Sequence, residues 1–226
     1  MNNTQNVTKI AYKVFRLSKG KKFSAIEKGP WQVNYENDGW ITPPHGANPF
    51  LFVFSTLKFA KQFVERHGFP KNGFLIKRVI ADGVTTKTLS LSGKKFEVDI
   101  FPEGTLFCQR LMIVRNTVTV YKATRKIQMY NSISPSFMSA ISRYSNVEYG
   151  IGKVTIPKKN ENQFLFVFRT EQAARKFRPH MNYTISKAKA YNVSSKSLDK
   201  SGYTFTTNPY PAGTRFAQAV ELVETL

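Results

Sequence analysis

The chain has 226 residues and repeats itself. The segment VTTKTL at 84–89 returns as VSSKSL at 193–198, an offset of 109 residues. An offset of 114 residues relates FLFVF at 50–54 to FLFVF at 164–168, so a few residues are inserted in the second copy. Because the similarity covers nearly the whole chain, the fold is expected to consist of two copies of one unit.

The two copies follow each other closely. Only residues 115–117 separate the last apolar run of the first copy from the first apolar run of the second, which is too short for a flexible tether. We therefore expect two domains, 1–116 and 117–226. They would either pack rigidly as two like domains or form one pseudo-twofold domain.

Each copy has the pattern of an α+β fold, in which one amphipathic helix covers a mainly antiparallel sheet, and we expect the copies to pack as a pseudo-twofold pair. Apolar residues at helical spacing predict helices over 57–66 and 171–178, with Thr56 and Thr170 as N-caps. A Pro-x-Gly-Thr turn precedes the last strand of each copy. Strands are predicted, each with its copy in the second half, for the apolar runs at 11–17, 50–54, 74–81 and 106–114.

The charge balance points to an anionic partner. The chain has 34 Lys and Arg against 14 Asp and Glu, a formal net charge of +20, shared as +10 by each copy. The 41% hydrophobic and 14% aromatic content excludes disorder throughout. No leader segment and no apolar run near the roughly 20 residues of a membrane helix is seen, so we expect a soluble, cytoplasmic protein, in the host cytoplasm if viral.

Neither catalysis nor a cofactor is expected. A single Cys108 and three scattered histidines exclude a disulfide framework and a Cys/His metal cluster. No acid recurs between the copies, since Asp82 aligns with Tyr191, and Cys108 aligns with Ala217, which is typical of a packed core thiol. Residues 18–22 (SKGKK) resemble the end of a phosphate loop but lack its leading glycine. An enzyme, for instance a degenerate nucleotide-transferring fold, is kept only as the second alternative function.

Basic residues, unlike acids, recur between the copies. We take these positions as candidate phosphate contacts. The six pairs are Lys13/Lys122, Arg16/Arg125, Lys28/Arg143, Lys61/Arg175, Arg78/Lys187 and Lys87/Lys196.

Two further shared features have both a functional and a structural interpretation. Tyr12 and Tyr121 could stack unpaired bases or pack in the core. The hydroxyl-rich loops around Lys87 and Lys196 could contact phosphates or satisfy their own backbone as solvated hairpins. For the phenylalanines of 50–54, core packing is the better interpretation.

The segment 48–56 (NPFLFVFST) with the helix after it resembles the central strand and second helix of an RNA-recognition motif. It lacks the basic-Gly start, and a repeat of 109 residues is too long, so the pattern indicates convergence. The Tyr-Lys opening, the Phe-rich strand and the Pro-x-Gly-Thr strand resemble small bacteriophage proteins. The strongly basic tandem arrangement is similar to RNA-binding proteins of large bacteriophages, which implies a nucleic-acid role and names no catalytic residue.

The sequence thus predicts a non-enzymatic nucleic-acid-binding protein. RNA or single strands are favoured over duplex DNA, because no helix-turn-helix, zinc finger or basic-leucine pattern is present. The first alternative is a phage-type effector that binds an acidic host protein or a nucleotide signal.

Overall fold

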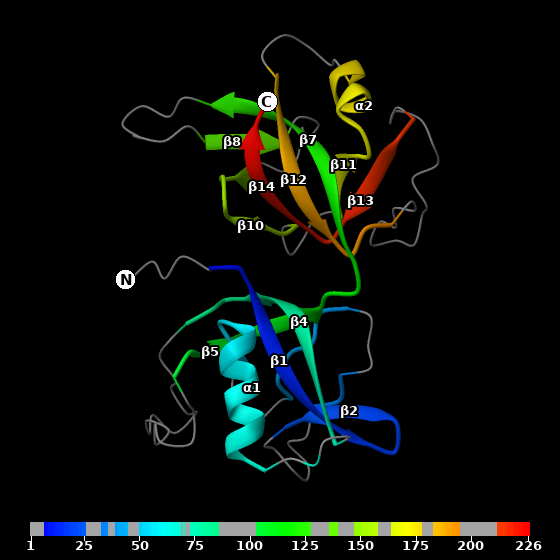
Figure 1. Ribbon diagram of the computed structural model, residues 1–226. Helices are drawn as coiled ribbons and strands as arrows, with labels where there is room; N and C mark the ends of the chain where they lie inside the picture. Colours follow the sequence, from blue (N-terminus) through cyan, green and yellow to red (C-terminus); the bar gives the residue numbers. More distant parts are fainter. Residues whose placement is uncertain are drawn as a thin grey trace. The chain divides into compact units, whose positions relative to one another are not determined.

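The computed structural model divides the chain into two compact units, Met1–Val114 and Arg115–Leu226 (Figure 1). Each unit is described by itself. The residues that the structure describes are 7–25, 33–35, 39–44, 50–68, 70, 73–85, 103–127, 136–139, 147–157, 164–177, 183–194 and 212–226.

The first unit is one antiparallel sheet with one helix, α1 (Leu57–Arg66). Its strands follow the order β5-β3-β1-β4-β6, and β2 forms a hairpin with β1. The strands are β1 (Lys9–Ser18), β2 (Lys21–Ser24), β3 (Leu51–Phe54), β4 (Phe74–Asp82), β5 (Thr105–Cys108) and β6 (Arg110–Ile113).

The second unit has the order β10-β14-β12-β7-β11-β13, with β8 paired to β7 and β9 to β8, and one helix, α2 (Glu171–Lys176). Strands that align in the sequence repeat hold the same places: β13-β11-β7-β12-β14 corresponds to β5-β3-β1-β4-β6. The strands are β7 (Thr117–Ile127), β8 (Ser136–Ser139), β9 (Glu148–Tyr149), β10 (Val154–Thr155), β11 (Leu165–Phe168), β12 (Tyr183–Tyr191), β13 (Thr214–Ala217) and β14 (Ala219–Thr225). The α+β class is confirmed.

The prediction of one continuous strand over 106–114 is wrong. Gln109 divides it into β5, which pairs with β3, and β6, which pairs with β4. The Gln109 N–H donates to the carbonyl of Asp82 at the point of division. The Cα atoms of Cys108 and Arg110, on either side of Gln109, can lie at most about 7 Å apart, so the two ends of the strand order must approach each other and the sheet must curl. Gln218 divides β13 from β14 in the second unit in the same way.

The helix starts follow the prediction. The Thr56 hydroxyl accepts a hydrogen bond from the Phe59 N–H at 3.3 Å, and the Thr170 hydroxyl accepts one from the Ala173 N–H at 3.2 Å. Helix α1 has the predicted bounds. Helix α2 ends at Lys176, two residues earlier than predicted, because Phe177 already leaves the helical region with ψ at 83°.

The glycines of the shared turn have the predicted role. Gly104 and Gly213 adopt φ values of +79° and +90°, a region that side chains with a Cβ rarely enter. Their carbonyls accept hydrogen bonds from the Ser55 and Arg169 N–H groups, which fixes the turn against the end of β3 or β11. Pro102 and Pro211 of the same turns lie outside the described residues.

Both faces of each sheet are covered. One cluster takes buried residues from all five central strands of the first unit, among them Ala11, Phe15 and Leu111, and we call this the inner face. The opposite face, covered by the helix, packs Val14 and Phe54 against Phe63 of α1, and we call this the helix-side face. Clusters of the same kind occupy both faces in the second unit. The core interpretation of the Phe-rich strands is confirmed, since β3 and β11 are buried at every residue.

Candidate nucleic-acid interface

Two of the predicted phosphate contacts are wrong. Lys13 and Lys122 are 0% exposed, so neither side chain can reach a phosphate on the surface. The alternation along β1 and β7 directs both lysines away from the helix, since their neighbours Tyr12 and Tyr121 pack in the helix-side clusters. They are core residues.

The amine of each lysine lies where two strands separate. Between β1 and β3 the described residues form a single register pair, Tyr12 with Phe54, so the ladder opens beside Lys13. The Lys13 Nζ donates to the carbonyl oxygen of Phe52 at 2.8 Å and lies 3.4 Å from the centre of the Phe52 ring. Tyr35 belongs to the inner-face cluster, and the centre of its ring lies 5.6 Å from the Lys13 Nζ. The amine therefore takes the place of a strand N–H and joins β1 to β3.

The second unit repeats this arrangement. Between β7 and β11 the single register pair is Tyr121 with Phe168. The Lys122 Nζ donates to the carbonyl oxygen of Phe166 at 2.7 Å, 3.4 Å from the centre of its ring, and lies 5.1 Å from the Tyr149 ring. Burial lowers the pKa of Lys122 well below its ordinary value of 10.5.

The predicted tyrosines and cations of the central strands come together. Tyr12 of β1 lies directly opposite Arg78 of β4, and Tyr121 of β7 lies directly opposite Lys187 of β12. Directly opposite residues share a face, with Cβ atoms about 5 Å apart. Since Tyr12 and Tyr121 pack against the helix-side clusters, both pairs lie on the helix-side face. Arg78 is exposed, whereas both tyrosines and Lys187 are half-buried.

Arg16 and Arg125 lie on the same face, four residues beyond the tyrosines and about 13 Å along the strand. Arg16 is half-buried between Phe74 and Phe23, with its guanidinium carbon 6.0 Å from the centre of the Phe23 ring. Its Nε is buried and has no hydrogen-bond partner among the described residues. Arg125 is exposed.

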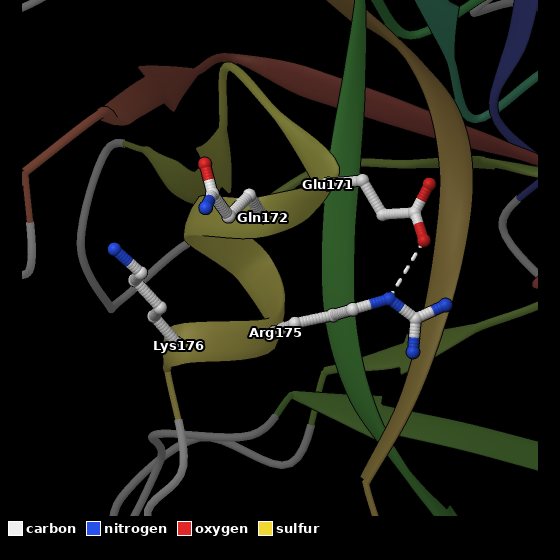
Figure 2. Close-up of a pocket in the computed structure, with 4 residues that line it drawn as sticks. All are labelled: Glu171, Gln172, Arg175 and Lys176. Atoms are coloured by element: carbon white, nitrogen blue, oxygen red, sulfur yellow. Dashed lines mark hydrogen bonds and ion pairs between the residues drawn. The ribbon is translucent and has the colours of Figure 1, made fainter.

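The helices add the last described candidates, Lys61 and Arg175, both exposed. Four residues of α2, Glu171, Gln172, Arg175 and Lys176, line a shallow hollow on the surface. Figure 2 shows Glu171 beside Arg175, with Gln172 and Lys176 on the other side of the helix. The Arg175 Nε forms an ion pair with the Glu171 carboxylate at 2.6 Å. One helix supplies the whole lining, so the hollow is part of the charged surface.

Four of the predicted contacts, Lys28, Lys87, Arg143 and Lys196, lie outside the described residues. Within the described ranges, three or more His, Cys, Asp or Glu side chains nowhere gather in a group that could hold a metal ion. Neither helix of the described chain has the length and hydrophobicity of a membrane span.

Two residues of types that can act in catalysis, Cys108 and Asp82, are held by contacts inside the first unit. The Cys108 thiol is buried against the carbonyl of Leu51, and burial raises its pKa from 9.0 to about 12, so it is no nucleophile. The Asp82 carboxylate accepts hydrogen bonds from Arg110 at 2.7 Å and from the Thr8 hydroxyl at 2.8 Å. Both residues therefore have structural roles.

The sequence analysis missed the carboxylates Glu221 and Glu224 of β14. Glu224 forms an ion pair with Lys187 at 3.1 Å, and Glu221 lies 3.9 Å from Lys189 while it accepts a hydrogen bond from the Tyr191 hydroxyl. Because neither acid recurs in the first copy, the search for shared residues passed over them.

Comparison of the chain with protein families, with curated proteins and with solved structures found no match. The function is therefore argued from the geometry and the charges alone.

Proposed function

We propose that this protein binds RNA or other single-stranded nucleic acid, without catalysis, mainly through phosphate contacts made by its two basic units. The observation that carries the proposal is the pair of a tyrosine and a cation directly opposite each other on the helix-side face, present in both units as Tyr12 with Arg78 and Tyr121 with Lys187. Both units keep a tyrosine and a cation at this register although the copies have drifted at many other positions.

This pair suits a nucleotide chemically. A tyrosine ring offers a face on which any unpaired base can stack, which makes such contacts tolerant of sequence. A guanidinium or ammonium group beside it can contact the phosphate of the same strand. Duplex DNA keeps its bases stacked, so this combination favours single strands and RNA loops.

The proposed interface on each unit contains one tyrosine and three cations. In the first unit these are Tyr12, Arg16, Lys61 and Arg78, and in the second they are Tyr121, Arg125, Arg175 and Lys187. Lys13 and Lys122 are excluded because they are buried. The loop residues Lys28, Lys87, Arg143 and Lys196 remain proposed contacts.

We also propose that the units are two copies of one nucleic-acid-binding repeat that pack as a pseudo-twofold pair. The equal strand order, the buried lysine in the same strand opening, and the paired turn glycines support a common origin. A cytoplasmic site of action belongs to the same proposal.

The test is the salt dependence of binding to a labelled mixed-sequence single-stranded RNA. If all six described cations contact phosphates, the log–log slope of affinity against salt approaches about −4, from about −0.7 per phosphate on single strands. An acidic polypeptide of similar charge serves as the control and should bind more weakly, since it offers no base. A slope near zero, or equal affinity for the polypeptide, would remove the proposal.

A further inference from the structure

The two units differ in how the cations of the helix and of the helix-side face are paired. In the second unit Arg175 forms an ion pair with Glu171 at 2.6 Å and Lys187 with Glu224 at 3.1 Å. The corresponding residues of the first unit, Lys61 and Arg78, are exposed and form no ion pair with any residue that the structure describes. The equal net charges of +10 for residues 1–116 and 117–226 therefore conceal unequal surfaces.

Three acids of the second copy have no acidic counterpart in the first, and two of them, Glu171 and Glu224, account for the difference. Where the second copy has Glu171, Glu221 and Glu224, the aligned positions of the first copy hold Leu57, Met112 and Arg115. Glu221 lies beside Lys189, and the aligned residues Met112 and Ile80 are directly opposite each other and buried. Each helix-side counter-ion of the second unit thus has an apolar or basic residue as its copy.

Among the described acids of the first unit, Asp82 and Glu65 are nearest in the chain to these cations, and neither replaces the missing partners. Asp82 lies on β4 with Arg78, but its carboxylate forms an ion pair with Arg110 and accepts a hydrogen bond from the Thr8 hydroxyl. Glu65 follows Lys61 by one helical turn, with the lysine first, which is the less favourable order, and the two form no ion pair. The guanidinium of Arg78 and the ammonium of Lys61 face solvent.

From these contacts we infer that the first unit makes most of the contacts to the RNA backbone, while carboxylates hold the matching cations of the second unit. This inference rests on the proposed function and assigns the phosphate-binding surface to Lys61 and Arg78. A cation that already forms an ion pair with a carboxylate binds a phosphate less favourably, because binding must first separate the pair. Fewer phosphates are then neutralised and fewer counterions are released from the RNA. The second unit then contacts the RNA mainly through Tyr121 and Arg125.

The experiment compares two matched double variants of the full chain, Lys61→Ala/Arg78→Ala and Arg175→Ala/Lys187→Ala. Binding of a labelled mixed-sequence single-stranded RNA is measured over a range of salt concentrations. The first variant should lose about tenfold in affinity, and its log–log slope should shrink by about 1.4, from two lost contacts. The second should lose less than about twofold, with its slope unchanged.

A third variant, Glu171→Gln/Glu224→Gln, removes the counter-ions and should bind several-fold more tightly with a steeper slope. Unchanged Tm values for all three variants exclude unfolding as the cause. Equal losses in the two cation variants, or no gain in the glutamine variant, would overturn the asymmetry while leaving RNA binding intact. Wild-type protein that binds without salt dependence would instead overturn the proposed function, and the inference with it.

Discussion

Lys122 donates a hydrogen bond of 2.7 Å to the carbonyl of Phe166 and lies 3.4 Å from the centre of the ring of the same residue. Its Nζ therefore joins β7 to β11 beyond their single register pair, Tyr121 with Phe168. Lys13 does the same for β1 and β3 in the first unit. A long side chain with a terminal donor supplies this hydrogen bond in both units, and this structural role accounts for the recurrence of lysine.

The first prediction concerns Lys122 and pH. Burial lowers the pKa of this amine in the folded protein, whereas the unfolded chain keeps a value near 10.5, so the unfolded chain binds more protons between the two values. The free energy of unfolding should therefore rise as pH rises through this window, with a slope approaching about 1.4 kcal/mol per pH unit. Lowering the pH through the same window reverses the gain.

The matched variant for this test is Lys122→Met, which keeps most of the length of the side chain and removes the titrating group. Denaturant unfolding at a series of pH values should show a flatter rise than in wild-type protein. The free energy at neutral pH should change less than in Lys122→Ala, which also leaves a cavity and should cost about 2–4 kcal/mol. An equal pH dependence in wild type and Lys122→Met would show that Lys122 is not the source.

The second prediction concerns the effect of the Cys108 thiol on stability at high pH. Burial raises the pKa of Cys108 to about 12, so its contribution to stability is complete below pH 9 and is lost as pH rises from 9 toward 12. Cys108→Ala, which introduces the residue of the second copy, should cost about 1 kcal/mol at neutral pH. Its stability relative to wild type should then recover above pH 9, measured in the same unfolding series.

The third prediction compares the turn glycines. An added Cβ at Gly104 would clash with the Phe59 ring, whereas at Gly213 it would lie 3.3 Å from the Ala173 Cβ. Both substitutions place alanine at positive φ, which costs about 1–2 kcal/mol. Gly104→Ala should therefore lower the free energy of unfolding clearly more than Gly213→Ala. Equal losses of unfolding free energy in the two variants would mean that the positive φ alone, and not the contact with Phe59, sets the cost.

Local rules predicted part of this molecule and tertiary contacts decided the rest. The caps Thr56 and Thr170 and the turn glycines were predictable, because each depends on its immediate neighbours. The alternation Ala11, Lys13, Phe15 places Lys13 on the inner face, but a lysine there is tolerated only where β3 separates and leaves a carbonyl as acceptor. No sequence pattern reports such an opening.

The candidate site divides in the same way. Recurrence between the copies identified Arg78 and Lys187, and their alignment opposite the tyrosines depends on strand register, which the sequence leaves open. The division of the last strand at Gln109 carries no proline or glycine signal at that residue. The ion pairs of Glu224 and Glu171 were missed because a search for shared residues discards the features in which two copies differ.

The fourth prediction transfers a counter-ion from the second unit to the first. Leu57 is 41% exposed at the start of α1, and Leu57→Glu places a carboxylate four residues before Lys61, as Glu171 precedes Arg175. An acid in the first helical turn stabilises a helix, so Tm should be unchanged or higher. RNA affinity should fall about two- to threefold because the carboxylate competes with phosphate for Lys61.

The neutral control for that variant is Leu57→Gln, which has nearly the same shape as glutamate and no charge. Fluorescence anisotropy with the labelled single-stranded RNA should return wild-type affinity for Leu57→Gln. If glutamate and glutamine at this position bind alike, the Lys61 ammonium takes no part in the interface.

The last prediction tests whether the tyrosines stack on bases. Tyr12→Leu/Tyr121→Leu keeps apolar contact with the helix-side clusters and removes both rings, whereas Tyr12→Phe/Tyr121→Phe keeps the rings and removes only the hydroxyls. Loss of one base–ring contact costs about 1–3 kcal/mol, so the leucine variant should bind RNA at least tenfold more weakly, while the phenylalanine variant should stay near wild type. The salt slope should be the same in all three proteins, since stacking releases no counterions. Leucine variants that keep both wild-type affinity and wild-type Tm would make the tyrosines packing residues and leave the cations as the whole interface.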